Sequence, residues 1–502
     1  MVKNICSVLL FIFPFIHCHS QILPKEGSEL NYRIVPFSFP VSGGSFTLEI
    51  ASGRYFSEDS FRKNIVLKKI DTGNKIIAEV PAFGSQYTWR ITPNSGSKSG
   101  KRPSFYHFST GIIPEVDTSM TRLRIIQPAL EYKDAYVFCD GAKALYDMKG
   151  NPVWYLPKIE GRSIYPTDLK ISPSGSITFL IDQAFDINYE GHILWKAPNT
   201  GEVNGRKLEH SHENYHHEFT KLNNGHYMIL GMELVHCQIP TEKINRGIVF
   251  DSTAHLYLPF GTIIEYDPAG KVVWNWKSSK YFLESDLVNY RPADGSMFVD
   301  IHENSFYFDE QNKIIYLNCK GISRIIKIKY PEGVVLGNYG EIYMPGVPVK
   351  GNPLYCGQHS IRRASDGNLL LFNNNACDTG ALPMIEKIKE PVLDKGQPEI
   401  IWEYQFSRDI TAPNGFPKGG NILELPDNSL FVSTADPDSK LFILSLNKKI
   451  LWSACLEKKN KETNEWIPLS QYRASIIITS KQLDQLIWNS IGINILQDHP
   501  NR

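Results

Sequence analysis

Residues 355–375, YCGQHSIRRASDGNLLLFNNN, contain the pattern from which the fold is inferred. His359 opens a short strand, an Asp-Gly turn follows, and the apolar run at residues 369–372 forms a second strand. Asp-Gly between two such runs is a strong hairpin signal, because glycine accepts the positive φ of the turn. Residues 216–230, HHEFTKLNNGHYMIL, repeat this order of histidine, glycine turn and apolar strand. The repetition predicts a repeat fold whose units present equivalent strand starts to a common place.

A second repeated pattern ends in tryptophan. An aliphatic residue, a turn and a strand precede each of Trp154, Trp195, Trp274, Trp402 and Trp452, and residues 325–339 have the same shape without the tryptophan. About six repeats result, with spacings from 41 residues (Trp154 to Trp195) to 79 residues (Trp195 to Trp274). Such repeats predict an all-β fold, a six-bladed β-propeller over residues 116–502. We expect a loop insertion at residues 237–260 and a tail strand at residues 475–479 that completes the first blade.

The N-terminal part of the chain differs from these repeats. Lys3, an apolar run at residues 8–16 and the residues up to Ser20 predict a signal peptide over residues 1–20. A periplasmic or secreted protein is therefore expected, and no later segment reaches the length of a membrane span. Short strands separated by Gly, Pro and Ser begin at residue 28. They predict a small β-sandwich domain over residues 21–115.

Charge and cysteine usage exclude some classes of function. The chain has 53 basic and 53 acidic residues and a formal net charge of 0, so it has no basic field for nucleic acid. Six cysteines follow the predicted signal peptide, and no pair forms a C-x-x-C motif, which argues against a zinc ribbon. Cys356 and Cys377 flank the hairpin quoted above. In an exported chain they form either a disulfide or two small buried thiols.

Polar residues and glycines open the inner strands of the predicted blades, which in a propeller begin around one axial opening. They are Asp168, His217, His302, His359 and the pair Gly419–Gly420. Three histidines at equivalent positions favour a functional site over three separate structural roles. Asn304 lies two residues beyond His302, on the same strand face, and Arg324 opens the next strand of that repeat. By the same alternation, His216 and His217 are expected to point in opposite directions.

These residue types favour chemistry on an anion. Arginine supplies a fork of donors and asparagine an amide donor, although three histidines alone would also suit a metal. Imidazole acts as a nucleophile, an acid or a base. Sulfuryl or phosphoryl transfer through a covalent histidine adduct fits this set, because such a reaction mainly needs positioning and charge stabilisation. A non-catalytic propeller that binds a ligand or partner, and a metal-dependent propeller lyase or hydrolase, are the alternatives.

Residues 216–225, the HEN of residues 302–304 with the arginine of GISR, and residues 358–375 resemble the bacterial periplasmic arylsulfate sulfotransferases, which use no nucleotide donor. The resemblance covers most of the mature chain and implies a β-sandwich before a six-bladed propeller. It implies that His359 is the nucleophile that becomes sulfated. His217, His302, Asn304 and Arg324 would bind the sulfate oxygens and help to transfer the proton. The implied reaction moves a sulfuryl group from an aryl sulfate ester to a phenol by a ping-pong mechanism, without a metal or other cofactor, often in a homodimer.

Two departures from the family pattern bear on the substrate rather than the reaction. The chain has Phe372–Asn373–Asn374–Asn375 where the family tends to have F-D-N-G, and residues 237–260 have no counterpart in the family. Two other sulfate-handling classes lack their motifs in this chain. It contains neither the C/S-x-P-x-R of a hydrolytic sulfatase nor the phosphosulfate-binding P-loop of a nucleotide-dependent sulfotransferase.

Overall fold

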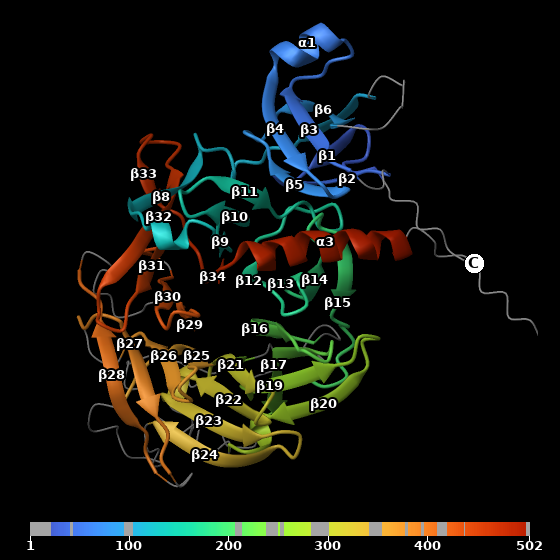
Figure 1. Cartoon of the computed structure of the whole chain (residues 1–502). Helices are drawn as coiled ribbons and strands as arrows, with labels where there is room; N and C mark the ends of the chain where they lie inside the picture. Colours follow the sequence, from blue (N-terminus) through green and yellow to red (C-terminus); the bar gives the residue numbers. More distant parts are fainter. Residues whose placement is uncertain are drawn as a thin grey trace, which may run out of the picture. The chain divides into compact units, whose positions relative to one another are not determined.

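The computed structural model describes residues 22–40, 44–94, 104–205, 213–236, 249–250, 256–282, 301–340, 354–376, 380–392, 396–408, 419–435 and 437–497. The predicted signal peptide at residues 1–20 lies outside these ranges. The chain divides into two compact units, Met1–Gly111 and Ile112–Arg502. Strands dominate each unit, as an all-β fold requires (Figure 1). Within the described ranges, no helix is long and apolar enough to cross a membrane.

The first unit consists of two sheets. The larger has the strand order β1 (Ser28–Leu30), β7 (Tyr106–Thr110), β6 (Gln86–Pro93), β3 (Phe46–Ser52) and β4 (Ile65–Asp71), and in the smaller β2 (Ile34–Ser38) pairs with β5 (Lys75–Glu79). Helix α1 (Glu58–Lys63) connects β3 to β4. The ring of Phe37 on β2 lies 5.0 Å from that of Trp89 on β6 and 6.1 Å from that of Phe108 on β7. These buried aromatic contacts join the two sheets through one core.

The second unit contains six antiparallel sheets in the part of the chain that the structure describes. The first sheet has the order β11 (Pro152–Tyr155), β10 (Ala144–Asp147), β9 (Tyr136–Cys139) and β34 (Ala474–Ile477). The second consists of β12 (Thr167–Ile171), β13 (Ile177–Leu180), β14 (Ala184–Ile187) and β15 (Ile193–Lys196). The third consists of β16 (Tyr215–Lys221), β17 (Tyr227–His236), β19 (Leu256–Tyr266), β18 (Val249–Phe250) and β20 (Val272–Lys277).

The remaining three sheets follow in chain order. The fourth consists of β21 (Glu303–Asp309), β22 (Ile314–Cys319), β23 (Arg324–Lys329) and β24 (Val334–Gly340). The fifth consists of β25 (His359–Arg363), β26 (Leu369–Asn373), β27 (Met384–Lys389) and β28 (Glu399–Gln405). The sixth consists of β29 (Asn421–Glu424), β30 (Leu430–Ser433), β31 (Lys440–Leu444), β32 (Ile450–Lys459) and β33 (Trp466–Pro468), and β8 (Thr121–Gln127) pairs with β32.

The inner strands of these sheets follow one another around a ring (Figure 1). Strand β12 contacts β16, β16 contacts β21, β21 contacts β25 and β25 contacts β29, while β34 contacts both β12 and β30. Both ends of the unit close this ring, because the late strand β34 pairs with β9 and the early strand β8 pairs with β32. The predicted tail strand is therefore confirmed at Ala474–Ile477, whereas the exchange of β8 into the sixth sheet was not predicted.

Hydrogen bonds from side chains to backbone connect neighbouring inner strands. They join Asp168 to the amide of Phe219 (3.1 Å), Ser305 to the amide of Ile361 (3.4 Å), Ser360 to the amide of Ile422 (3.2 Å), Asn421 to both backbone groups of Ala474, and Ser475 to the carbonyl of Leu169 (2.8 Å). In each bond a side chain of one sheet satisfies a backbone group of the next sheet. Short polar side chains near the strand starts thus hold adjacent sheets in register.

The repeated tryptophans connect the sheets at their outer strands. The indole Nε1 of Trp154 on β11 donates to the carbonyl of Tyr189 in the second sheet, at 2.7 Å. Trp274 on β20 donates to Pro331 in the fourth sheet at 2.7 Å, and Trp402 on β28 donates to Leu446 in the sixth sheet at 2.9 Å. Trp452 on β32 donates to Met148 in the first sheet at 3.2 Å. The tryptophan repeat therefore marks the contact between successive sheets.

One sequence-based expectation about this unit needs correction, and one element was not predicted. The predicted insertion at residues 237–260 is not simply a loop, because residues 249–250 form β18 and residues 256–260 belong to β19, which pairs with β17 up to His236. The C-terminal helix α3 (Ser480–Gln497) was not predicted. It buries Leu483, Leu486 and Ile487, which share one face of a helix at this spacing.

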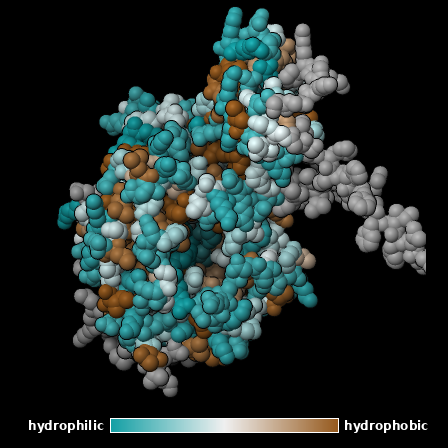
Figure 2. All heavy atoms as spheres, viewed as in Figure 1, coloured by the Kyte–Doolittle hydropathy of each residue, from teal (hydrophilic) through white to brown (hydrophobic). Residues whose placement is uncertain are grey.

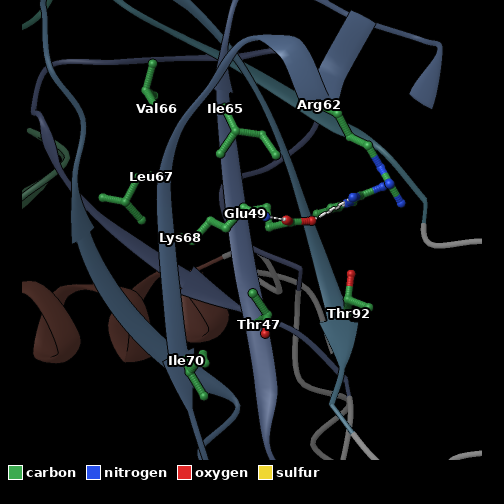
Figure 3. A pocket seen from close by; sticks show the side chains of 10 residues that line it. Thr47, Glu49, Arg62, Ile65, Val66, Leu67, Lys68, Ile70 and Thr92 are labelled. Carbon is green, nitrogen blue, oxygen red and sulfur yellow. Dashed lines mark hydrogen bonds and ion pairs between the residues drawn. The ribbon is translucent and has the colours of Figure 1, made fainter. Parts of the chain in front are cut away.

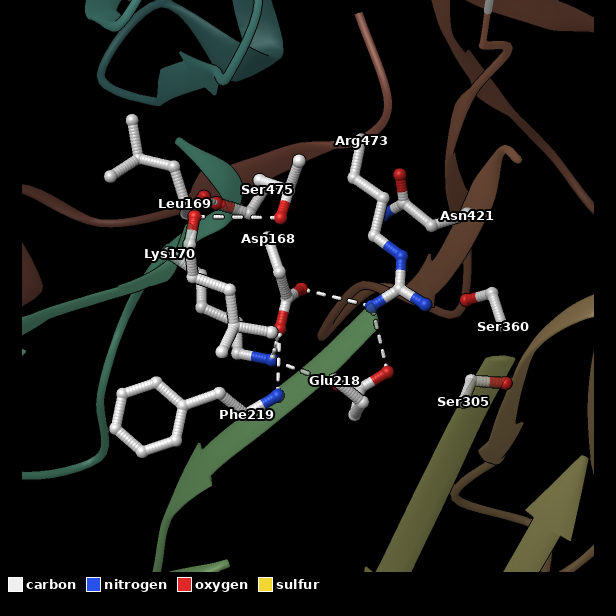
Figure 4. Close-up of polar contacts among 12 residues, drawn as sticks. Asp168, Leu169, Lys170, Glu218, Phe219, Ser305, Ser360, Asn421, Arg473 and Ser475 are labelled. Atoms are coloured by element: carbon white, nitrogen blue, oxygen red, sulfur yellow. Dashed lines mark hydrogen bonds and ion pairs between the residues drawn. The ribbon is translucent and has the colours of Figure 1, made fainter. Parts of the chain in front are cut away.

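A buried ion-pair cluster joins the inner strands near the axis of the ring (Figure 4). Nη1 of Arg473 lies 3.0 Å from Oδ1 of Asp168 and 2.7 Å from Oε2 of Glu218. Lys170 contacts the same two carboxylates at 2.6 and 2.8 Å, and Arg362 contacts Glu218 at 3.1 Å. Burial alone would raise the pKa of Glu218, but these cations outweigh it and hold that pKa far below its ordinary value. The cluster connects the second, third and fifth sheets to the segment that leads into β34.

We predict that Glu218→Gln destabilises the second unit by about 3–5 kcal/mol, because buried cations lose their shared counter-charge. The matched control is Glu457→Gln. Glu457 also contacts two arginines, Arg122 and Arg124, both at 2.8 Å, but their side chains are 35% and 44% exposed. That change should cost about 1 kcal/mol or less. Urea unfolding followed by tryptophan fluorescence compares the two, and equal losses would contradict a special role for the axial cluster.

Candidate functional site

Four inner strands have a non-glycine residue with left-handed backbone near their first residues. The φ angles are 56° at Asp168, 63° at His217, 52° at His302 and 53° at Ser360. Register shifts in the ladders of β12, β16, β21 and β25 occur at the same places. A left-handed L-residue costs roughly 1–2 kcal/mol, and a bulge redirects side chains near the start of a strand. The strained backbone positions of these four strands therefore lie around one end of the ring's axis.

The bulge in β16 brings two consecutive histidines together. Nδ1 of His216 lies 2.7 Å from Nδ1 of His217, and their ring centroids are 4.9 Å apart. The prediction that these side chains point in opposite directions is therefore wrong. Strict alternation holds for regular strand backbone, and the positive φ at His217 interrupts it.

The structure brings the three sequence-predicted histidines into one cluster. The ring of His217 lies 5.2 Å from that of His302 and 5.7 Å from that of Tyr472, and the rings of His359 and Tyr472 are 6.4 Å apart. Each histidine comes from a different sheet, and Tyr472 comes from the segment before β34. In Figure 2, mostly hydrophilic residues surround a hollow near the middle of the ring.

The side chain of His359 is buried, and its neighbours contact the ring at Nδ1. Its Nδ1 lies 2.7 Å from Nδ2 of Asn374 and 3.3 Å from the carbonyl oxygen of Gly357. Asn374 itself donates to that carbonyl at 2.6 Å. These two neighbours occupy the Nδ1 side, and no described residue forms a hydrogen bond with Nε2. When Nδ1 carries the hydrogen and donates it to the Gly357 carbonyl, the lone pair of the neutral ring lies on Nε2. In that tautomer Nε2 is the ring nitrogen left for chemistry.

The surroundings keep two of the histidines neutral. Burial lowers the pKa of His359 well below its ordinary value, and the charges of Lys320, His302 and Arg473 lower it further. Burial likewise lowers the pKa of His217, with His216 as the next cause. Both rings are consequently uncharged near pH 7 and carry a lone pair.

The two other predicted site residues reach His359 through its neighbour Gln358. Nδ2 of Asn304 donates to the Gln358 carbonyl at 2.9 Å, and Oδ1 of Asn304 accepts from Asn318 at 2.6 Å. Gln358 donates to the carbonyl of Arg324 at 3.1 Å. Asn304 is fully buried and Arg324 is 9% exposed. The Asn304 side chain and the Arg324 carbonyl therefore support the backbone that presents His359.

Sequence reasoning missed three residues of this cluster. Tyr472 touches two of the histidines, and its hydroxyl is buried without a hydrogen-bond partner among the described residues. Lys320 is the cation that acts most strongly on His359, and Asn374 contacts its ring. Asn374 lies in residues 355–375, directly after the second strand of the hairpin that His359 opens. That position could have identified it from the sequence as a neighbour of His359. Tyr472 and Lys320 lie outside any repeated pattern and had no such signal.

The described cysteines lie apart from the histidine cluster in the sequence or are buried. Cys356 is disulfide-bonded, and Cys377, its predicted partner, lies outside the described residues. Cys139, Cys319 and Cys455 are free and buried. Within the described ranges, no three His, Cys, Asp or Glu side chains are arranged to hold a metal ion.

An open groove of about 980 Å³ lies in the first unit, on the face of β3, β4 and β6 (Figure 3). Its charges are already paired, since Glu49 contacts Lys68 and Arg90 at 2.7 Å each. Another groove, of about 490 Å³, lies between β20 and the β23–β24 turn. Neither groove is lined by the clustered histidines.

We predict that Asn374→Asp raises the pKa of His359 by roughly one to two pH units, because a carboxylate beside Nδ1 stabilises the imidazolium. The ring then begins to charge at higher pH than in the wild type. Asn375→Asp is the matched control, since the side chain of Asn375 faces the carbonyl of Leu382 at 3.4 Å and should shift His359 less. NMR titration of ¹⁵N-labelled histidine measures both shifts. Equal shifts, or none in Asn374→Asp, would contradict this contact.

The chain has structural relatives at low similarity. A protein of unknown function from Bacteroides caccae is 13% identical over 71% of this chain and 99% of its own length, with a TM-score of 0.40. A quinonprotein alcohol dehydrogenase-like protein from Bacteroides thetaiotaomicron is 13% identical over 91% and 99%, with a TM-score of 0.30. The β-propeller domain of Cps50 (Swd1) from Myceliophteria thermophila is 11% identical over 61% and 96%, with a TM-score of 0.32.

Sequence similarity adds a family assignment. No curated protein matches the chain. Residues 136–392, just over half of the chain, match the Arylsulfotransferase (ASST) family. The matched segment includes His217, His302 and His359. The chain therefore belongs to the arylsulfotransferase family.

Proposed function

We propose that this arylsulfotransferase moves a sulfuryl group from a phenolic sulfate ester to a phenol through a sulfohistidine on His359. One observation carries the proposal. His359 is a buried imidazole whose Nδ1 is held by Asn374 and Gly357, while Nε2 has no partner among the described residues. Its lowered pKa keeps the ring neutral at neutral pH, and the lone pair lies on Nε2 in the tautomer whose Nδ1–H donates to Gly357. A nucleophile held in this state needs no separate base to activate it.

The first half of the reaction forms a nitrogen–sulfur bond. Nε2 of His359 attacks the sulfur of the donor ester, and the bond from sulfur to the phenolic oxygen breaks. The electron pair of that bond leaves with the oxygen, and a neighbouring histidine, His217 or His302, gives the departing phenolate a proton. A donor ring that starts neutral must gain a proton on its other nitrogen in the same step. The free phenol leaves before the acceptor enters, which is the order of a ping-pong mechanism.

The second half reverses these steps with another phenol. The same imidazole takes the proton of the acceptor hydroxyl, and the phenolate oxygen attacks the sulfur. The nitrogen–sulfur bond breaks and returns its electron pair to Nε2 of His359. No atom or electron is left over, so the cycle needs no redox partner or nucleotide donor.

Cations and hydrogen-bond donors around His359 would stabilise the negative charge on the sulfuryl oxygens. Lys320 lies close enough to lower the pKa of His359 and would attract an anionic group. The hydroxyl of Tyr472 is an unused donor beside both His217 and His359. Arg324 and Asn304 hold Gln358 and with it the start of β25. In this proposal Lys320 and Tyr472 contact the sulfate, and the Asn304 side chain and the Arg324 carbonyl position His359.

The setting of the reaction is also a proposal. We infer that the six sheets of the second unit are the blades of a six-bladed β-propeller and that the first unit is a small β-sandwich. Exported after loss of residues 1–20, the protein would work in the periplasm or outside the cell. Small aryl sulfates and phenols are its expected partners, in a homodimer without a metal or other cofactor.

We predict that His359→Ala lowers aryl-sulfate transfer by at least about 10³-fold while the protein stays folded, because no other group holds the sulfuryl adduct. His226→Ala is the control, since His226 contacts Glu265 at 2.7 Å, outside the cluster. Initial rates with 4-nitrophenyl sulfate and phenol measure the effect, and double-reciprocal plots of the wild type should be parallel. Activity that dies with chelator and returns with a divalent ion would instead make the histidines metal ligands.

Tyr472→Phe should separate activity from stability. Losing a hydrogen bond to a charged group costs about 1.5–3 kcal/mol, so kcat/KM should fall about tenfold to 150-fold. The melting temperature should stay equal or rise, because the mutation removes a buried hydroxyl without a partner. Tyr132→Phe is the control, since its hydroxyl donates to Asp427 at 2.7 Å and its loss should lower stability but not activity. Unchanged turnover in Tyr472→Phe would place this hydroxyl outside the reaction.

A further inference from the structure

The contact between His216 and His217 links the histidine cluster to a second titratable ring. Their Nδ1 atoms are 2.7 Å apart, a distance at which one nitrogen donates a hydrogen and the other accepts it. Because Nδ1 of His217 is used in this way, Nε2 is its remaining nitrogen. His217 lies beside His302 and Tyr472. His216 precedes it in the chain, and both side chains are partly exposed.

We propose that His216 exchanges a proton with His217 in each half of the reaction, so that the pair stores the proton between the departure of one phenol and the arrival of the next. The inference rests on the proposed function and deepens it. His216 is a positioning residue, because it acts on the substrate only through His217.

The proton count balances if the cycle begins with His216 protonated and His217 neutral with its hydrogen on Nε2. When the donor bond breaks, Nε2 of His217 gives its proton to the departing phenolate, and Nδ1 takes a proton from Nδ1 of His216. Both rings are then neutral, and Nε2 of His217 carries a lone pair. The acceptor phenol returns a proton to Nε2, and the Nδ1 proton passes back to His216.

A pair of histidines can exchange a proton beside the cluster without placing a positive charge on His217. Burial and the charges of His216, His302, His359 and Arg473 oppose a full positive charge on His217. In the exchange described above, His217 never becomes an imidazolium, because it gains a proton on one nitrogen as it loses one from the other. The charge rests on His216, which is partly exposed.

Two variants test this exchange against a purely structural role. His216→Asn retains a side-chain amide near Nδ1 of His217 but cannot carry a proton, and His216→Phe removes the contact altogether. Transfer from phenyl sulfate to phenol should fall about tenfold to 100-fold in both variants, because this poor leaving group needs full proton donation. The first-turnover burst with 4-nitrophenyl sulfate, whose nitro group makes the leaving phenol far more acidic, should change less than about threefold.

The controls separate this inference from the proposed function. His226→Asn alters a histidine of the same sheet and should leave both donors unaffected, since His226 pairs with Glu265. Equal losses with both donors, or recovery in His216→Asn alone, would overturn the exchange and leave His216 as a fixed hydrogen-bond partner. Wild-type rates in both variants would overturn it as well. A wild type without any burst would contradict the proposed function itself.

Discussion

The contact of Arg473 with Asp168 and Glu218 is the constraint on which the second unit depends. The guanidinium also donates to the carbonyl of Asn304 at 3.0 Å, so one side chain reaches the second, third and fourth sheets. A buried cation with a missing partner is costly, which restricts how these sheets can be placed. The last segment of the chain therefore closes the ring by charge as well as by the pairing of β34 with β9.

This constraint also determines the chemistry of the cluster. Arg473 fixes the position of Tyr472, its neighbour in sequence, and the backbone amides of both donate to Asp140, at 2.8 and 3.0 Å. Glu218, which binds Arg473, follows His217 directly, at the bulge that turns this histidine toward His216. Burial that makes the ion pairs strong also keeps His217 and His359 neutral. The same buried surroundings therefore strengthen the ion pairs that hold the sheets together and keep the imidazoles of His217 and His359 neutral.

Repetition made the all-β class, the tail strand and the three clustered histidines predictable from the sequence. The tryptophans and the histidine hairpins recur because each sheet meets the same neighbours. The sequence could not show features that break this repetition. His216 was misplaced because a positive φ at a histidine has no sequence signature, and Tyr472 and Lys320 occur only once, without equivalents in other repeats. The predicted anion contacts of Asn304 and Arg324 remain predictions, because sequence cannot tell a ligand donor from a residue that supports one.

The most direct test of the central claim is to isolate the covalent intermediate. The protein is incubated with 4-nitrophenyl sulfate in the absence of a phenol acceptor, and intact and peptide mass spectrometry then locate any added group. The account predicts one sulfuryl group per chain on His359, stable to alkali, labile to acid and discharged by added phenol. Release of nitrophenol with no sulfuryl group on His359, or with the group on another residue, would contradict the account.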